Sequence, residues 1–243
     1  MVPVLGTFLY DPPPLLEEKG NIMNEKLKNS QMRVKKLVFA AIFTALAYTS
    51  TLIIHPKVSF LTFDVKDAII TLASMSFGPV AGVSISGLVA LLEFITISET
   101  GVYGLIMNFL SSATFAVVSS LIYKYKKTMF GGIIGLVASV FATTAIMLLA
   151  NIVVTPYFMK STTEEVLKLI PKILLPFNLL KCVANAGLVI GFYKPISNAL
   201  KAVGAVKRRE EETLRLDKTT VLLLLIAMMI TAIAIFIMFG VMA

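Results

Sequence analysis

The apolar stretch of residues 169–192 carries the polar side chains Asn178, Lys181 and Asn185. Their spacing places all three on one face of a helix. An ammonium near the middle of a bilayer costs roughly 2.5 to 3.5 kcal/mol, so we expect Lys181 to face an interior partner or a wet cavity. This polar face predicts a ligand-binding site. Alternatively, Lys181 reaches the membrane surface along its own stem, if the helix starts only after Pro176, but this leaves the two amides unexplained.

The composition is that of an integral membrane protein. Of the 243 residues, 57% are hydrophobic and only 15% are charged, and the mean hydropathy is +0.88. The net charge of +8 is concentrated in short stretches beside apolar runs, a pattern that sets membrane orientation and does not indicate a nucleic-acid partner. One cysteine, Cys182, excludes an internal disulfide, and the single His55 is expected to be solvated, so no metal site is predicted.

Apolar runs that predict membrane helices follow one another along the chain. They cover residues 37–54, 68–77, 80–97, 102–123, 131–157, 169–192 and 221–242. The second run is far shorter than the roughly 20 residues that a crossing needs, so its helix must include residues from Asp64 onward, tilt, or enter the bilayer only part way.

The domain organisation follows from these runs and from the polar segments between them. Residues 1–31 are polar or proline-rich and are expected to be disordered, with Met23 as an alternative start. Residues 32–201 are expected to form a six-helix substrate-binding membrane domain. Residues 202–218 read as a charged cytoplasmic linker, and 219–243 as an additional seventh, C-terminal transmembrane helix.

Clusters of Lys and Arg predict how the chain lies in the membrane. The clusters at 33–36, 124–127 and 207–209 fall on one side if the helices cross in alternation. Because cytoplasmic loops are rich in Lys and Arg, this side is expected to be the cytoplasm, with the N-terminus inside. The loops around Lys57, Glu99 and Glu164 are then external.

Counting helical turns from the outer ends places polar residues of four helices at a similar depth. They are Glu93, Asn108, Asn151, Asn178 and Lys181. Their shared depth favours an outward-facing pocket for a small polar-aromatic molecule, in which Glu93 and Lys181 partly neutralise each other. The alternative is that each amide only joins two helices through a hydrogen bond worth roughly 0.6 to 2 kcal/mol.

The external connection of residues 58–67 carries two carboxylates and several apolar side chains. Asp64 and Asp67 have a spacing that allows a cation site, but the simpler prediction is that Asp64 caps the following helix and Asp67 supports its first turn. Phe60, Leu61 and Phe63 in an exposed loop suit a lid over an aromatic ligand.

Small residues on the first span, Ala41 and Ala45 with Ala40 and Ala47 beside them, allow close approach of another helix. This helix belongs either to a partner or to the same chain. Enzyme signatures are missing from the sequence: it has no G-x-x-x-x-G-K-[ST] loop, no G-x-S-x-G elbow and no H-E-x-x-H pair. The chain is therefore predicted not to be an enzyme and not to hydrolyse ATP itself.

Several segments together resemble a known family. FAAIFTALA, FLTFDVKDA, FGPVAG, NFLSS and PFNLLK are similar to segments of the riboflavin-specific substrate-binding subunits of energy-coupling-factor (ECF) vitamin transporters. The resemblance covers residues 33–201 and implies an all-α six-helix membrane bundle of the ECF S-component type. It also implies capture of riboflavin from outside the cell, a membrane coupling subunit and two cytoplasmic ABC ATPases as partners, and no cofactor. The seventh span and the extension before Met23 lie outside the usual six-helix unit.

The resemblance also assigns residues. In that family the residues matching Asn178 and Lys181 contact the flavin, and an asparagine resembling Asn151 contributes. The loop after the first helix closes over the ring, which adds Phe60, Leu61, Thr62, Phe63 and Asp64 to the expected binding residues. The ribityl hydroxyls are expected to take the remaining polar groups, Glu93 or Asn108. The face matching Ala41 and Ala45 docks the coupling subunit.

The leading hypothesis is therefore a high-affinity riboflavin-binding subunit of an ECF-type importer in the cell membrane. One alternative keeps the architecture and changes the vitamin to thiamine, biotin or pantothenate. A second is a membrane enzyme acting on lipid phosphate with Asp64, Asp67 and Glu93 around Mg²⁺. A third is a purely structural bundle, in which Asn178 and Lys181 tolerate apolar replacement.

Overall fold

The computed structural model of the chain describes residues 14–54, 56–58, 60–126 and 128–206, together with Leu222 and Met229. It divides into two compact units, Met1–Val38 and Phe39–Ala243. The first unit contains the N-terminal part of α1, and the second contains every other described element. The elements are α1 (Pro14–Ile53), β1 (Lys57–Val58), β2 (Leu61–Thr62), α2 (Lys66–Phe77), α3 (Pro79–Thr96), α4 (Gly101–Tyr125), α5 (Met129–Met159), α6 (Thr163–Leu169), the π-helical turn η1 (Ile170–Leu174) and α7 (Leu175–Ala202).

The all-α fold class predicted from the sequence is confirmed. Five helical segments of the described chain are long and apolar enough to cross a membrane: Ile22–Ile53, Pro79–Thr96, Gly101–Tyr125, Met129–Met159 and Thr163–Ala202. The helix α2 has only 12 residues and is about 18 Å long at roughly 1.5 Å per residue, well short of a hydrocarbon core about 30 Å thick. The predicted seventh span lies outside the described residues, apart from Leu222 and Met229.

The disorder predicted for residues 1–31 is wrong for residues 14–31, which are helical as part of α1. This segment is rich in Glu, Lys and Leu, which favour helix even where the segment is polar. Residues 1–13 lie outside the described chain.

Two chain reversals position the polar residues of the second unit. Gly78 ends α2 with φ 104° and Pro79 begins α3 at once, which suits a glycine in the left-handed region followed by a proline at the first helical position. At the other reversal, a capping box between Thr162 and Glu165 starts α6. The wide π turn of η1 follows, in which the N–H of Leu175 donates to the carbonyl of Ile170.

Packing in the second unit is close where small residues face a neighbouring helix. A Cβ on Gly135 of α5 would lie 2.7 Å from the backbone oxygen of Ser119 in α4, so the two backbones approach as nearly as glycine allows. Buried residues of α1, α2, α3, α4, α5 and α7 share one apolar core, which includes Phe43, Ile70, Phe115 and Val189.

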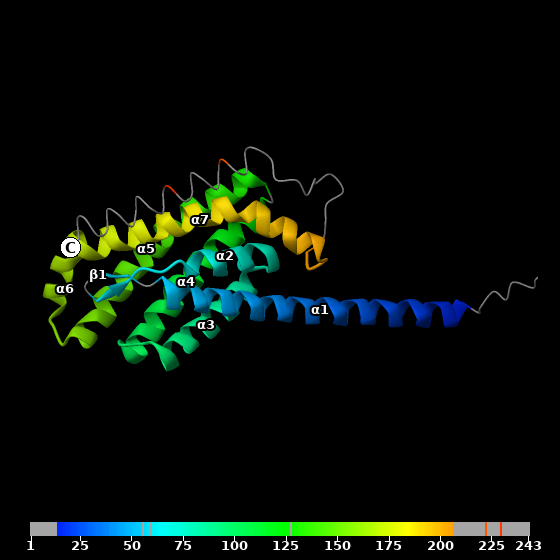
Figure 1. The fold of residues 1–243 in the computed structure, drawn as a ribbon, viewed down its shortest axis with the longest axis horizontal. Coiled ribbons are helices and arrows are strands. Elements are labelled where there is room, and N and C mark those ends of the chain that lie inside the picture. Colours follow the sequence, from blue (N-terminus) through cyan, green and yellow to red (C-terminus); the bar gives the residue numbers. More distant parts are fainter. Residues whose placement is uncertain are drawn as a thin grey trace, which may run out of the picture. The chain divides into compact units, whose positions relative to one another are not determined.

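The connection between the first two helices, expected as an exposed loop, contains a two-stranded antiparallel hairpin. Lys57 pairs with Thr62, and Val58 pairs with Leu61. Figure 1 shows β1 and the short helix α6 at the same end of the bundle. Phe60, Leu61 and Thr62 of the hairpin line the first cavity described below.

Candidate ligand-binding site

Lys181 lies inside the protein, as the sequence predicted, and its partner is a carboxylate of the connection between β2 and α2. The Nζ of Lys181 donates to Oδ2 of Asp64 at 2.9 Å and lies 3.7 Å from Oδ2 of Asp67. Lys181 is 6% exposed. The helix α7 starts at Leu175, close to the start near Pro176 that the alternative required. The pairing of Lys181 with Asp64 inside the bundle nevertheless contradicts that alternative, in which the ammonium reaches the membrane surface.

Asp67, in the first turn of α2, is held by two serines of α4. Ser112 donates to its Oδ1, and Ser111 donates to its Oδ2 at 3.4 Å. All three side chains are buried. A carboxylate with two hydroxyl donors and a nearby ammonium is well satisfied in a low-dielectric setting, which fixes the start of α2 against α4.

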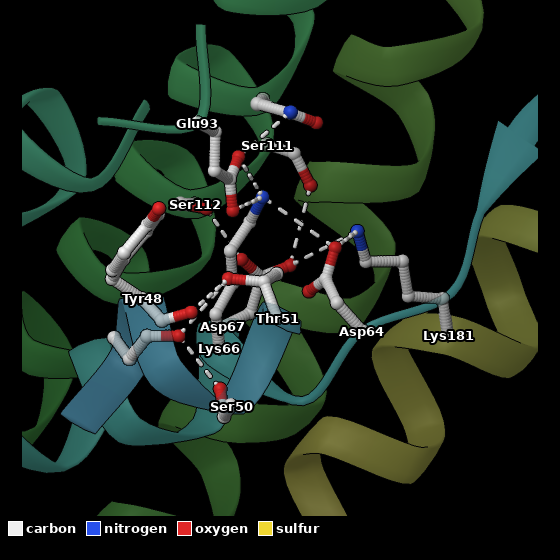
Figure 2. Close-up of polar contacts among 12 residues, drawn as sticks. Tyr48, Ser50, Thr51, Asp64, Lys66, Asp67, Glu93, Ser111, Ser112 and Lys181 are labelled. Carbon is white, nitrogen blue, oxygen red and sulfur yellow. Dashed lines mark hydrogen bonds and ion pairs between the residues drawn. The ribbon is translucent and has the colours of Figure 1, made fainter. Parts of the chain in front are cut away.

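A second ammonium, Lys66, pairs with Glu93 of α3. Its Nζ lies 2.7 Å from Oε1 and 2.6 Å from Oε2 of that carboxylate, and Figure 2 shows it pointing at Glu93. The Nδ2 of Asn108 donates to Oε2 of Glu93 at 2.9 Å. The expected neutralisation of Glu93 by Lys181 is therefore wrong, because Lys66 takes this carboxylate and Lys181 takes Asp64.

Asp64 lies between the two ammoniums, as Figure 2 shows, 3.5 Å from Lys66 and 2.9 Å from Lys181. Burial alone would raise the pKa of the Asp64 carboxyl, but Lys181 and Lys66 outweigh it and hold the pKa below its ordinary value of 3.8. Asp64 is therefore ionised at neutral pH. The capping role predicted for Asp64 is wrong, because Val65 occupies the N-cap of α2 and no side chain caps it.

Asn185 joins the same connection to α7. Its Nδ2 donates to the backbone oxygen of Asp64 at 3.0 Å, and its Oδ1 accepts from the backbone N–H of Ala68 at 2.8 Å. The side chain is fully buried. The polar face predicted on the sixth span is confirmed as a buried face, but Asn185 contributes to structure and lines neither cavity described below.

Three helices and the hairpin surround a cavity of about 130 Å³. Asn108, Asn151, Asn178 and Lys181 bring four of the predicted polar residues to its wall, and Phe60, Leu61 and Thr62 contribute from the hairpin. Apolar and aromatic side chains complete the lining: Tyr103, Met107, Met147, Val154, Phe158 and Phe177. A few polar groups set among apolar ones are typical of small-molecule sites.

An adjoining cavity of about 490 Å³ has a different character. Asp64, Lys66, Glu93 and Glu99 supply charges, and Thr51, Thr62, Ser98 and Thr100 supply hydroxyls. Phe60, Thr62, Thr100, Asn108 and Phe158 line both cavities. The two cavities therefore meet at these residues.

The hydrogen bonds of the amides decide which of their atoms are available to a ligand. Asn178 donates its Nδ2 to the backbone oxygen of Leu174, and Asn151 donates its Nδ2 to that of Met147. Because a backbone carbonyl can only accept, each amide turns one N–H to its own helix, and its oxygen and second N–H are the groups that it can offer elsewhere. The Oδ1 of Asn151 also accepts from Thr155 at 2.8 Å.

The aromatic residues of the hairpin do not all behave as predicted. Phe60 lies 6.4 Å, between ring centroids, from Phe158 of α5, which in turn lies 6.3 Å from Tyr103 of α4. Phe63, expected in an exposed loop, is fully buried against Phe177 and Ala184 and lines neither cavity. Its chain position directly after β2 turns it into the core, so only Phe60 and Leu61 of the three predicted lid residues line the ring cavity.

Sequence reasoning missed several residues of this site. Lys66 was not singled out, although a lysine at the start of an apolar helical run must have a partner when that run is buried. Ser111 and Ser112 stood within a recognised segment but carried no assigned role. In the described chain, no three His, Cys, Asp or Glu side chains are placed to hold a metal ion.

The family model described as "ECF transporter, substrate-specific component" matches residues 35–193. A solved chain described as "Structure and mechanism of the S component of a bacterial ECF transporter" superposes with a TM-score of 0.60 at 28% identity, over 70% of this chain and 99% of that one.

Two related proteins are riboflavin transporters. The riboflavin transporter RibU of Staphylococcus aureus (strain TCH60) is 27% identical over 190 residues, which is 74% of this chain and 100% of that protein. The riboflavin transporter FmnP of Bacillus subtilis (strain 168) is 26% identical over 162 residues, which is 62% of this chain and 85% of that protein.

Proposed function

Because the chain belongs to the family of substrate-specific components of ECF transporters, and is thus a multi-pass membrane transport protein rather than an enzyme, we propose that its substrate is riboflavin. The vitamin would bind in the two adjoining cavities and be passed on with a separate energising module. Both named relatives are riboflavin transporters. The membrane-enzyme alternative is set aside by the family.

One observation carries the choice of substrate: the two cavities differ in chemistry and meet at Asn108 and Phe158. The first, lined by aromatic, apolar and amide side chains, suits a flat ring with apolar faces and polar edges. The second, lined by charges and hydroxyls, suits a tail of several hydroxyl groups. Riboflavin combines the isoalloxazine ring with a ribityl chain and so matches both.

The ring would lie with its edge toward Asn151, Asn178 and Lys181, and the tail toward Glu93. Phe60 and Leu61 of the hairpin would cover the ring, with Thr62 and Asp64 at the passage to the tail. Asp64 connects the hairpin to α7 through its contacts with Lys181 and Asn185. The hairpin residues that would cover the ring are therefore held against the polar side chains of α7.

Fluorescence titration of the detergent-purified protein with riboflavin tests this proposal. We expect the protein to be yellow when isolated from flavin-containing medium, and to quench riboflavin fluorescence at stoichiometric concentration once stripped. A protein that leaves the fluorescence unchanged, while binding thiamine, biotin or pantothenate by calorimetry, would reassign the substrate and keep the family.

We propose an orientation with the N-terminus in the cytoplasm, and a six-helix substrate-binding domain over 32–201 followed by a linker at 202–218 and a further helix at 219–243. The basic clusters support the orientation, which places Glu99 outside. Glu99→Cys should react with a membrane-impermeant maleimide in intact cells, whereas the wild type, whose Cys182 is buried, should not. Labelling of Glu99→Cys only after the cells are opened would contradict the orientation.

We also propose that the face of α1 with Ala41 and Ala45 contacts the ECF coupling subunit, which works with two ABC ATPases. Both alanines are exposed, whereas Ala47 is buried in the core. Small exposed residues at this spacing allow close approach of a second helix.

Replacing Ala45 with leucine should therefore reduce riboflavin uptake by about tenfold or more, because the added bulk holds the helices apart, and should leave riboflavin affinity of the isolated chain unchanged. Uptake into cells that express the complete transporter measures this. The matched control is Ala202→Leu, at an exposed alanine near the end of α7. Equal uptake by Ala45→Leu and the wild type would contradict the assigned interface.

A further inference from the structure

A series of polar contacts leads from α2 through α3 to the wall of the polar cavity, where Glu93 and Asn108 face the proposed tail of the ligand. Lys66 donates to both oxygens of Glu93, at 2.7 and 2.6 Å, and the Oε2 of Glu93 accepts from Nδ2 of Asn108 at 2.9 Å. Lys66 and Glu93 are 2% and 3% exposed. Asn108 is half-buried and lines both cavities.

The direction of each hydrogen bond in this series is fixed by its chemistry. An ammonium only donates and an ionised carboxylate only accepts, so Glu93 must receive a hydrogen from Asn108. The amide therefore turns its nitrogen to Glu93. Its oxygen takes no hydrogen bond from any residue that the structure describes, and Asn108 is half-buried on the wall of both cavities.

The position of the Glu93 carboxylate depends on Lys66, which donates to both of its oxygens. Without this ammonium the buried carboxylate would lose its paired cation and would turn toward other donors. The nitrogen of Asn108 would then no longer be held by a fixed acceptor, and its oxygen would no longer be fixed toward the cavities.

We propose that Lys66 is a positioning residue for substrate recognition: by holding both oxygens of Glu93 in place, it fixes Asn108 with its amide oxygen toward the ligand, so that the junction of the two cavities accepts a hydrogen bond from a ligand hydroxyl. This inference rests on the proposed function for its ligand. Because Asn108 lies where the ring cavity meets the polar cavity, the hydroxyl belongs to the tail close to the ring.

Two flavins separate positioning from a general loss of structure. Riboflavin carries the hydroxylated tail, and lumiflavin carries a methyl group in its place. In Lys66→Met we expect riboflavin affinity to fall by about tenfold, the effect of one lost hydrogen bond, and lumiflavin affinity to change by less than about twofold. Lys66→Arg, whose planar fork matches both oxygens of a carboxylate, should restore the wild-type ratio of the two affinities.

A mutant cycle shows whether Lys66 acts through Asn108. If it does, Lys66→Met combined with Asn108→Ala binds riboflavin no more weakly than Asn108→Ala alone. Equal losses for riboflavin and lumiflavin in Lys66→Met, or additive losses in the double variant, would overturn the proposal.

Measuring the thermal unfolding of the same variants without ligand distinguishes a failure of the proposed function from a failure of the role proposed for Lys66. A wild type that binds no flavin refutes the proposed function. The coupling of Lys66 to Asn108 is then judged by the unfolding temperatures alone. If the decreases caused by Lys66→Met and Asn108→Ala add up in the double variant, the coupling is refuted. If the double variant shows a smaller decrease than that sum, the coupling is supported.

Discussion

Lys181→Met should weaken riboflavin binding by about 10- to 150-fold, the range that corresponds to losing one hydrogen bond from a charged donor. Lys181 lies on the wall of the ring cavity while it is held by Asp64 and is close to Asp67. An ammonium has three hydrogens, and the hydrogen bond to Asp64 uses one of them, so it can donate to a ring carbonyl without leaving its carboxylate partners. Methionine fills a similar volume and donates nothing.

The same substitution should also lower the free energy of unfolding, by about 3 to 5 kcal/mol, because a buried carboxylate loses its partner. Asp64 keeps only Lys66, at 3.5 Å, and its Oδ1 has no hydrogen-bond partner among the described residues. Stability and affinity must therefore be separated by a second variant.

The matched variant is Lys181→Met combined with Asp64→Asn, which removes the uncompensated charge. Thermal unfolding should recover in part, whereas riboflavin affinity, measured by fluorescence quenching, should remain as weak as in Lys181→Met. Full recovery of affinity in the double variant would mean that Lys181 acts only on stability. Wild-type affinity in Lys181→Met would remove Lys181 from the site.

Two asparagines on one face of α7 should respond in opposite ways to the same exchange. Asn185→Leu leaves the backbone oxygen of Asp64 without its side-chain donor, and it leaves the N–H of Ala68 with only the 3.2 Å hydrogen bond to the backbone oxygen of Val65. A buried unsatisfied group costs about 1 to 3 kcal/mol, so we expect a loss of about 1 to 3 kcal/mol in the free energy of unfolding and loosening of the connection to the hairpin.

Asn178→Leu is the control for that exchange. Asn178 donates only within its own helix, to the backbone oxygen of Leu174, and it lines the ring cavity. Its loss should change unfolding by less than about 1 kcal/mol and weaken riboflavin binding by about tenfold. Chemical denaturation and fluorescence titration measure the two effects. Equal destabilisation by both variants would contradict the roles assigned here.

The sequence alone determined that α7 carries a buried polar face and that the polar residues of four helices belong together. Both conclusions depend on properties that act along the chain: the helical period decides which side chains share a face, and the cost of a charge in lipid decides that the face turns inward. The short second helix followed from its length in the same way. The segments that resemble the ECF family specified the fold class more closely than the helical periodicity of the sequence did.

Only the tertiary structure decided which charges pair. Lys181 and Asp64 are separated by 117 positions and Lys66 and Glu93 by 27, and no local pattern indicates which carboxylate each ammonium meets. Asp64 was therefore mistaken for a cap, Phe63 for an exposed residue, and Glu93 for the partner of Lys181. Partner choice in a low-dielectric interior depends on the relative positions of several helices, because the strongest pairings form between groups that folding brings within about 3 Å.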